Sequence, residues 1–273
     1  MEYFRDKISV ITGAASGIGR ALCEVLGQEE AVIIAADINT EGAQEVASTI
    51  TKAGGRASSV HLDVSRAEDV TNIVNKVASE HGRIDYLFNN AGISVSGEVR
   101  DMNLEHWQKV IGVNLSGVIY GTTAAYPLMV NQGFGHIVNI ASVAGLIGYP
   151  INTPYAATKF AVVGLSISLR NEGADLGVKV SAVCPGYVQT AIYDVTPILK
   201  ADREKVLANI PFKMMDAKKA AQLILKGVVR NKAIIIFPFH AVFLWWLYRL
   251  HPALLTPLGL KGVKEFRALR TQD

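Results

Sequence analysis

The fold is decided by one stretch near the N-terminus, Ile8-Ser9-Val10-Ile11-Thr12-Gly13-Ala14-Ala15-Ser16-Gly17-Ile18-Gly19. A mostly apolar run, typical of a buried strand, enters a glycine-rich turn, and apolar residues with helical spacing follow. Glycines at such a turn let the backbone approach a pyrophosphate, which the N–H groups of the helix start can bind. The spacing G-x-x-x-G-x-G differs from the commoner G-x-G-x-x-G, so the position after a strand carries this prediction. A glycine-rich turn without a ligand is the alternative.

Six further runs rich in Val and Ile alternate with amphipathic segments along the chain. They are Ala31–Ala36, Ser59–Leu62, Tyr86–Phe88, Ile137–Ile140, Val178–Val183 and Ala233–Phe237. One helical segment opens on Ser65-Arg66-Ala67-Glu68, which has the pattern of a capping box. Seven strands separated by helices predict an α/β fold, a Rossmann-type, doubly wound, seven-stranded parallel sheet with helices on both faces. We expect one catalytic domain over residues 1–273.

Composition excludes several other classes. Half of the 273 residues are hydrophobic and 19% are charged, which excludes a mainly disordered chain. The net charge of +3 comes without a dense basic run, so we expect no nucleic-acid partner. Two cysteines, Cys23 and Cys184, make no disulfide framework. No secretory signal is visible and we assign no metal site, so that a cytoplasmic protein is expected.

Asp37 stands at the end of the second run, eighteen residues after Gly19. A carboxylate there accepts hydrogen bonds from the adenosine ribose hydroxyls and repels the 2′-phosphate of NADP. Arg20 is the one nearby cation whose side chain could reach the 2′-phosphate and favour NADP. We therefore predict NAD as the cofactor and NADP as the less favoured alternative. The structural alternative for Asp37 is a residue at a helix N-terminus, where the helix dipole favours a negative charge.

Polar and small residues also follow the third and fourth runs, at Asp63-Val64 and Asn89-Asn90-Ala91-Gly92. In an open α/β sheet, ligands bind beyond the carboxyl ends of the strands. We therefore expect Asp63 at the adenine amino group, with Val64, Asn90, Ala91 and Gly92 along the cofactor cleft. Each of them alone also fits an ordinary turn.

Beyond the fifth run lie three residues whose side chains are suited to proton transfer. Ser142 closes that run, and Tyr155 and Lys159 are four residues apart, on one face of the next helix. A nearby ammonium group favours the phenolate, so we expect Lys159 to lower the pKa of Tyr155 and make it a general acid/base. Ser142 can donate to a substrate oxygen on which charge develops. A helix face with a tyrosine and a solvated lysine is the alternative.

These motifs resemble the short-chain dehydrogenase/reductase family in order and spacing over about residues 5–237. They are Thr12–Gly19, Asp63, Asn89–Gly92, Asn114, Ser142, Tyr155, Lys159 and Pro185-Gly186. The resemblance implies that Tyr155 exchanges the proton, that Lys159 also holds the nicotinamide ribose, and that Ser142 polarises the substrate oxygen. It further implies that Asn114 holds a water in a relay with Lys159. The segment Pro185-Gly186-Tyr187-Val188-Gln189-Thr190 would contact the carboxamide through Val188 and Thr190.

The expected activity is hydride transfer between NAD and a lipophilic alcohol or ketone of steroid, retinoid, terpenoid or long-chain type. A lid at about residues 190–215 and the residues after Ser142 are largely apolar, which favours such substrates. The alternatives are a 3-ketoacyl-type carbonyl reductase using NADPH and a membrane-associated NAD-binding module without turnover. By resemblance we expect a homodimer or homotetramer, paired through helices around Asn103–Val130 and Pro154–Asp175.

The last part of the chain, residues 238–273, is an apolar extension on which the family motifs are silent. It contains two of the three tryptophans, and no charge occurs from Ala233 to Tyr248. A bilayer span needs about 20 apolar residues, and Pro238 and His240 interrupt this run. We expect it to cover the sheet, line the substrate site, contact another subunit or lie in a membrane interface.

Overall fold

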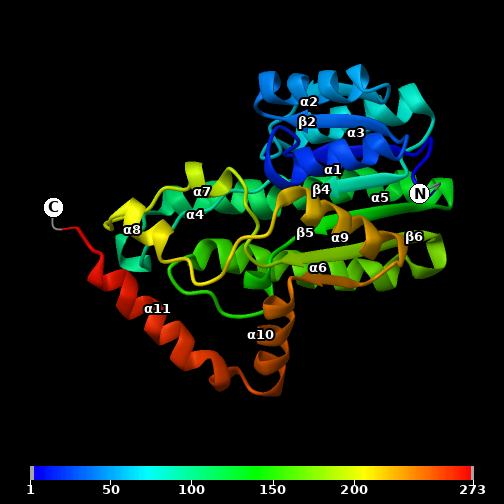
Figure 1. The fold of residues 1–273 in the computed structure, drawn as a ribbon. Helices are drawn as coiled ribbons and strands as arrows, with labels where there is room; N and C mark the ends of the chain where they lie inside the picture. The colour runs from blue at the N-terminus through cyan, green and yellow to red at the C-terminus, as the bar shows by residue number, and fades with distance from the viewer. Residues whose placement is uncertain (1–2, 272–273) are drawn as a thin grey trace.

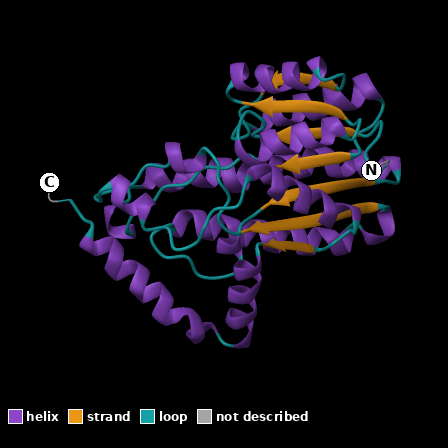
Figure 2. Cartoon of the chain, viewed as in Figure 1, coloured by secondary structure: helices purple, strands orange, loops and turns teal. Residues whose placement is uncertain are grey.

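The computed structural model describes residues 3–271, so residues 1, 2, 272 and 273 of the predicted domain and extension lie outside it. Its strands are β1 (Ile8–Thr12), β2 (Val32–Asp37), β3 (Arg56–His61), β4 (Tyr86–Asn89), β5 (Gly135–Ile140), β6 (Val178–Pro185) and β7 (Ile234–Phe237). They form one parallel sheet in the order β3-β2-β1-β4-β5-β6-β7, and their carboxyl ends face the same set of loops (Figure 2). The predicted seven-stranded Rossmann-type fold is confirmed.

Helices cover both faces of the sheet (Figure 1). One face packs against α1 (Gly17–Gln28), α2 (Thr40–Lys52) and α9 (Ala217–Val229). The other packs against α3 (Ala67–His81), α5 (Gly117–Gln132) and α6 (Thr153–Glu172). Shorter helices lie beyond the carboxyl ends of the strands, namely α4 (Leu104–Ile111), α7 (Ile192–Val195) and α8 (Arg203–Ala208).

Strand β3 begins at Arg56, three residues before the predicted run. It lies at the edge of the sheet. Its residues alternate between exposed and partly buried, so that the continuous apolar signal of a central strand is missing. The predicted capping box after it is wrong. Helix α3 begins at Ala67 after Arg66, without a side-chain cap. The backbone N–H and the hydroxyl of Ser65 donate instead to Asp63 Oδ1, at 2.9 and 2.7 Å, because a carboxylate is the stronger acceptor.

The chain direction across the sheet reverses between β1 and β4. The chain runs from β1 outward to β3 and then returns to place β4 on the other side of β1. In doubly wound sheets the crevice at this switch point is where ligands bind. Thr12 pairs in register with Ala36, and Asp37 pairs with His61, so the ends of these strands share the edge that borders the crevice.

The C-terminal extension consists of two helices, α10 (Phe239–Leu250) and α11 (Thr256–Ala268), joined by the short 3₁₀ helix η5 (Pro252–Leu255). Helix α10 projects away from the sheet, and α11 returns toward α8 (Figure 1). The inward face of α10 buries Ala241 and packs Leu244 and Trp245 against the core cluster below β6. Within residues 3–271, no helix has the length and apolar character needed to cross a bilayer.

Candidate active site

The glycine-rich turn after β1 is a tight backbone cradle. Gly13 and Gly17 have φ angles of 66° and 54°, which residues with a Cβ rarely adopt. A Cβ on Gly17 would lie 2.9 Å from the Thr190 side chain, and one on Gly19 only 2.0 Å from the carbonyl oxygen of Gly13. The turn therefore has the exposed, closely folded backbone that the approach of a pyrophosphate requires.

Helix α1 begins directly after this turn with its N–H groups uncapped, since the Ser16 side chain makes no capping hydrogen bond. Such groups, at the positive end of the helix dipole, bind phosphate. The facing wall is held by Thr12, whose hydroxyl accepts hydrogen bonds from the N–H groups of Asn90 and Ala91 at 2.9 and 3.1 Å. The Asn90 amide in turn donates to the Thr12 carbonyl at 2.8 Å. Asn90 therefore braces the turn, while its backbone borders the cleft.

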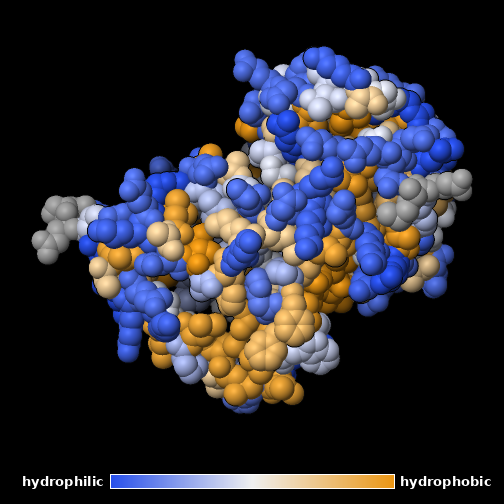
Figure 3. Space-filling model, in the orientation of Figure 1, coloured by the Kyte–Doolittle hydropathy of each residue, from blue (hydrophilic) through white to orange (hydrophobic). Residues whose placement is uncertain are grey.

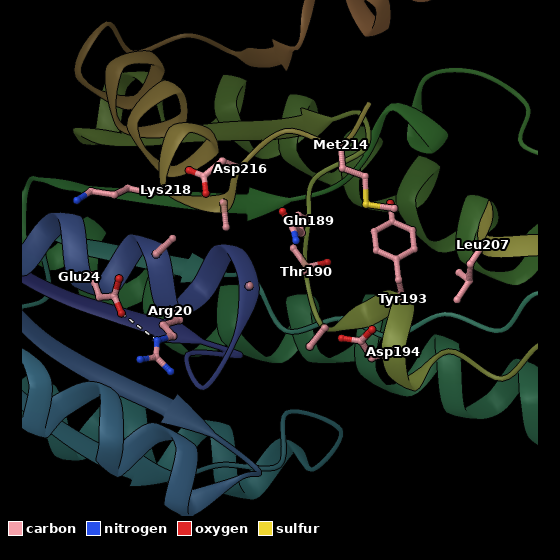
Figure 4. A pocket seen from close by; sticks show the side chains of 14 residues that line it. Arg20, Glu24, Gln189, Thr190, Tyr193, Asp194, Leu207, Met214, Asp216 and Lys218 are labelled. Carbon is pink, nitrogen blue, oxygen red and sulfur yellow. Dashed lines mark hydrogen bonds and ion pairs between the residues drawn. The ribbon is translucent and has the colours of Figure 1, made fainter. Parts of the chain in front are cut away.

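Asp37 is held in place at the end of β2. Its carboxylate accepts hydrogen bonds from the N–H groups of Ala15 and Asn39, at 2.9 and 2.8 Å. Arg20, the cation that can favour NADP, is engaged elsewhere. It pairs with Glu24 and Glu45 at 2.9 and 3.1 Å, and Figure 4 shows it beside Glu24. Hydrogen bonding to Glu24 raises the pKa of Arg20. A ligand phosphate would have to compete with two carboxylates for this guanidinium.

Asp63 lies at the end of β3 as an ionised acceptor. The hydrogen bond from the Ser65 hydroxyl is the main cause that holds its pKa below the usual range. An ionised carboxylate can accept a hydrogen bond from an amino group but cannot donate one. Val64 is buried beside it against Gly117. The pair therefore offers one acceptor and one apolar wall at the mouth of the crevice.

Asn114 occupies an irregular part of the chain. It lies in a π-helical segment, Gly112–Ser116, between α4 and α5, and such insertions are frequent at functional sites. Its side chain is fully buried and forms two hydrogen bonds with the backbone of Ile93, at 2.8 and 2.9 Å. Asn114 and Lys159 both border Gly92, since a Cβ there would lie 3.5 Å from Asn114 Oδ1 and from Lys159 Nζ.

Ser142, Tyr155 and Lys159 meet beyond the end of β5. The Ser142 hydroxyl lies within hydrogen-bonding reach of the Tyr155 phenol. Lys159 Nζ donates to the Ile140 carbonyl at 2.7 Å and lies 5.4 Å from the centre of the Tyr155 ring. Lys159 is only 3% exposed, and a buried lysine without a carboxylate partner is unusual outside functional sites.

The two titratable groups of this cluster are shifted by burial in opposite directions. Desolvation raises the pKa of Tyr155, which the Ser142 hydrogen bond opposes. Desolvation lowers the pKa of Lys159 to about 8. The net shift for Tyr155 is therefore opposite to the lowering expected from Lys159, because removal of the phenolate from water dominates. At neutral pH the arrangement holds a protonated phenol beside a protonated amine.

One cavity of about 1020 Å³ runs from the glycine-rich turn past this cluster to the C-terminal helices. It lies at the upper end of the range of ligand pockets, about 300–1,000 Å³. Of the predicted site residues, Gly19 and Asn114 alone do not line it. Gly19 packs behind the turn and Asn114 behind Ile93. Both contact residues that do line the cavity, namely Gly13 and Ile93.

The C-terminal extension supplies a wall of the cavity, which is one of the placements expected for it from the sequence. Leu244 of α10 and Leu258, Phe266 and Leu269 of the α11 region line it. His240 also lines it, and its ring stacks on Phe212 of the lid with centroids 4.2 Å apart and planes 5° apart. The spacing of apolar residues in the extension predicts that its helices pack against something, but it does not show which face of each helix lines the cavity.

Four tyrosines surround the reaction centre, of which sequence analysis identified only Tyr155. The hydroxyls of Tyr149 and Tyr187 are hydrogen-bonded to each other, and burial raises the pKa of both phenols. Tyr193 of α7 lies close by, and burial raises its pKa as well. The site therefore offers neutral hydroxyl groups set in an otherwise apolar wall.

Ion pairs fix α11 over the cavity. Arg267 and Arg270 bind Glu98 at 2.6 and 3.0 Å, and Arg270 also binds Asp101. Hydrogen bonds from these arginines hold the pKa of both carboxyl groups below the usual range. The backbone of the lid is attached as well, through the N–H of Asp202 to the Leu269 carbonyl at 3.0 Å. The lid and the extension are thus joined to each other beside the cavity.

Comparison with known proteins places these features in a family. A family model described as short chain dehydrogenase matches residues 7–197. The chain is 38% identical over 220 residues to the 3-oxoacyl-(acyl-carrier-protein) reductase FabG of Thermotoga maritima, covering 80% of this chain and 89% of that one. It is 38% identical over 192 residues to the cyclohexanol dehydrogenase of Acinetobacter sp. strain SE19, covering 69% and 76% of the two chains.

A solved structure resembles the whole chain. It is a short-chain dehydrogenase/reductase from Burkholderia phymatum in complex with NAD, at a TM-score of 0.79 and 30% sequence identity. The match covers 100% of this chain and 99% of the other, so it includes the region of α10 and α11.

Proposed function

The chain belongs to the short-chain dehydrogenase family of oxidoreductases, and from that premise we propose that it oxidises lipophilic alcohols, or reduces the matching ketones, with NAD as its cofactor. The observation that carries this proposal is the single cavity joining the glycine-rich turn and Asp37 to Ser142, Tyr155 and Lys159, with an apolar wall beyond them. The uncapped start of α1 and the glycine cradle fit the pyrophosphate.

In this proposal each residue of the site has a defined task. NAD, when bound, supplies the hydride acceptor chemistry. The α1 N-terminus and Gly13, Ser16, Gly17 and Ile18 hold the pyrophosphate, Asp37 the adenosine ribose, and Asp63 the adenine amino group. Residues Asn90–Gly92 and Pro185–Thr190 form the walls around the nicotinamide half. Gly19 keeps the cradle closed.

Proton transfer is assigned to the buried cluster. Tyr155 takes the hydroxyl proton during alcohol oxidation and returns it during carbonyl reduction, and Ser142 donates a hydrogen bond to the reacting oxygen. Lys159 orients the nicotinamide ribose and presents a positive charge to the phenol. Asn114 keeps Ile93 in place beside Lys159 through its two hydrogen bonds, and we propose that it supports a water-mediated proton path from Lys159.

The preference for NAD is assigned to Asp37, and Asp37→Asn tests it. The variant keeps the size of the side chain and removes the charge that repels a 2′-phosphate. We expect the ratio of kcat/KM for NAD to that for NADP to fall by about thirtyfold, from the loss of a charge-assisted hydrogen bond worth about 2 kcal/mol. Glu41→Gln removes an exposed charge nearby, outside the cavity, and should leave the ratio unchanged. A wild-type protein that prefers NADP would contradict the assignment.

The lipophilic substrate class is supported by the wall beyond Tyr155. Residues of the lid and of the extension, among them Ile198, Leu244, Leu258 and Phe266, face the cavity. Besides Asp37, Asp63 and Lys159, its charged residues are Lys109 of α4 and Lys261 and Glu265 of α11, all three of them exposed. The alternative, a 3-oxoacyl reductase using NADPH, is favoured by the similarity to FabG, whereas the similarity to a cyclohexanol dehydrogenase favours a simple alcohol.

A homologous series of linear secondary alcohols tests the substrate class. Each added methylene that enters the cavity should raise kcat/KM about fourfold, from about 0.8 kcal/mol of burial. Leu258→Ala should reduce kcat/KM for the longest alcohols, while Leu260→Ala, on the same helix but outside the cavity, should not. If kcat/KM does not change with chain length, or if a short acyl thioester is reduced faster with NADPH, the reductase alternative is favoured.

The pH dependence of ketone reduction follows from the two shifted groups. Reduction needs a protonated Tyr155, whose raised pKa keeps its proton well above neutrality, and a charged Lys159, whose pKa is about 8. Below pH 8 both conditions hold, and above it Lys159 loses its charge. We therefore expect kcat/KM for NADH, which reports the free enzyme, to be level at lower pH and to fall as the pH rises through about 8.

Lys159→Arg provides the control, since a guanidinium stays charged over this range. We expect the variant to be slower, and its profile to lack the fall near pH 8. A wild-type profile that rises through this region, or a variant with the same inflection, would contradict the role given to Lys159.

Assembly into a homodimer or homotetramer remains part of the proposal. Helices α5 and α6 carry apolar residues with substantial exposure, namely Ile119, Phe160 and Ile167. Family members commonly associate, and apolar helix faces of this kind are typical of subunit contacts. The mass of the protein in solution, measured by light scattering, tests it, and a monomer would contradict it.

A further inference from the structure

The outward side of α10 carries a row of exposed apolar residues. Phe239, Phe243, Trp246 and Leu250 recur at the spacing of one helix face. They are 82%, 52%, 54% and 74% exposed, whereas Leu244 and Trp245 on the inward side pack against the core. The inward packing accounts for one apolar face of this helix and leaves the other without a packing partner among residues 3–271.

The row continues through η5 into α11 at Leu254 and Leu258, both about half exposed. In Figure 3 hydrophobic surface gathers at the end of the molecule where Figure 1 places the junction of α10 and α11. We refer to these six residues, Phe239, Phe243, Trp246, Leu250, Leu254 and Leu258, as the α10–α11 face. Continuous exposed apolar surface of this kind marks an interaction site.

The charges around the α10–α11 face are mainly positive. Glu265, the next carboxylate in the sequence, pairs with Lys261 at 3.7 Å. From Phe239 to Lys264 the sequence has no Asp or Glu, and its charged residues are Arg249, Lys261 and Lys264. All three side chains lie on exposed positions. Arg249 lies over the rings of Trp245 and Trp246, at 5.0 and 5.5 Å from their centres. Aromatic and leucine side chains with arginine and lysine beside them are typical of helices that lie in a lipid interface.

The charge pattern also distinguishes two partners that could cover the α10–α11 face, a second copy of the chain and a lipid surface. A second copy of the chain, pairing the same face about a twofold axis, would bring Arg249 and Lys264 of the two copies to one surface. The neighbouring carboxylate, Glu265, already pairs with Lys261, so the remaining positive charges oppose association. An anionic lipid surface complements the same residues, since each exposed Lys or Arg gains about 1 kcal/mol near such a surface. The face therefore matches an anionic bilayer better than it matches itself.

We propose that the α10–α11 face docks the protein onto an anionic lipid bilayer, with α10 lying in the plane of the interface. The edge of the cavity belongs to the same surface, because Leu258 and Lys261 are exposed and also line the cavity. Docking therefore brings the opening of the cavity to the bilayer surface, where a lipophilic ligand can enter without crossing water. Only this last consequence rests on the proposed function; the docking itself does not.

Co-sedimentation of the full chain with lipid vesicles tests the proposal. We expect binding to vesicles of phosphatidylcholine with phosphatidylglycerol, weakening as salt is added, and much less binding to phosphatidylcholine alone. The double variant Trp246→Ser, Leu250→Ser should lower the partition coefficient about a hundredfold, since each buried side chain contributes about tenfold. The matched double variant Leu104→Ser, Leu176→Ser changes two exposed leucines on other elements and should bind like wild type.

Three results would overturn the proposal. They are no binding to anionic vesicles, equal binding to both kinds of vesicle, and binding that the Trp246→Ser, Leu250→Ser variant retains. Light scattering adds a fourth, because a dimer that this variant dissociates would identify the face as a contact between copies. Thermal unfolding and NADH affinity show that each variant is folded, and neither readout requires turnover. A failure of docking is thus distinguishable from a failure of the proposed function.

Discussion

Replacement of Tyr155 by Phe is expected to reduce turnover by a factor of about 10³, within the contribution of about 10²–10⁴ that a positioned acid or base makes. The substitution keeps the ring in contact with Lys159 and removes the hydroxyl that exchanges the proton. Burial already keeps this phenol protonated at neutral pH, so its hydroxyl is the acid available for carbonyl reduction. NADH affinity, measured by fluorescence titration, should stay close to that of wild type.

Tyr126→Phe is the matched control for this substitution. The Tyr126 hydroxyl is buried on α5 without a hydrogen-bond partner, and it lies outside the residues that line the cavity. Its removal should leave turnover unchanged. A Tyr155→Phe enzyme that keeps most of its rate would show that another group transfers the proton, and the neighbouring hydroxyls of Tyr149, Tyr187 and Tyr193 would be the next to test.

The second large effect is expected at Gly19. In Gly19→Ala the new methyl group would lie 2.0 Å from the Gly13 carbonyl oxygen and 2.6 Å from Asn90 Nδ2, so the turn must open. Overpacking of this kind costs about 3 kcal/mol, and we expect NADH to bind about a hundredfold more weakly because the pyrophosphate cradle is displaced. Isothermal titration with NADH measures the loss directly.

Gly164→Ala is the corresponding control, since a Cβ there meets nothing within 4 Å. It lies inside α6 and outside the residues that line the cavity, so NADH affinity should stay at the wild-type value. Equal NADH affinity in Gly19→Ala and wild type would mean that the glycine-rich turn does not hold the cofactor, and it would remove the basis for assigning Gly13–Gly19 to the pyrophosphate.

Much of the fold was predictable because its signals are local. Central strands such as β1 and β6 are apolar almost throughout, and buried parallel strands need no information from elsewhere in the chain. The edge strand β3 lacks that signal, and its start was therefore missed. The capping box failed for a related reason, because the Ser65 hydroxyl had two acceptable partners and the nearby Asp63 carboxylate was the stronger.

The site was predictable where its residues follow strand ends and unpredictable where it depends on packing. The direction of the Tyr155 pKa could not be obtained from the spacing to Lys159, because it is set by how completely the surrounding elements exclude water. The C-terminal wall depends on contacts of very long range, such as Arg267 with Glu98. Asn114 gave no local signal either, since the π-helical segment that contains it appears only in the folded chain.

The most direct test of the whole account is a measurement of NADH formation by the purified protein with NAD and a medium-chain secondary alcohol, run beside NADP and beside Tyr155→Phe. We predict clear turnover with NAD, much slower turnover with NADP, and a rate near the blank for the variant. Tight binding of NADH without turnover of any alcohol or matching ketone would contradict the proposed reaction, as would a rate that Tyr155→Phe leaves unchanged.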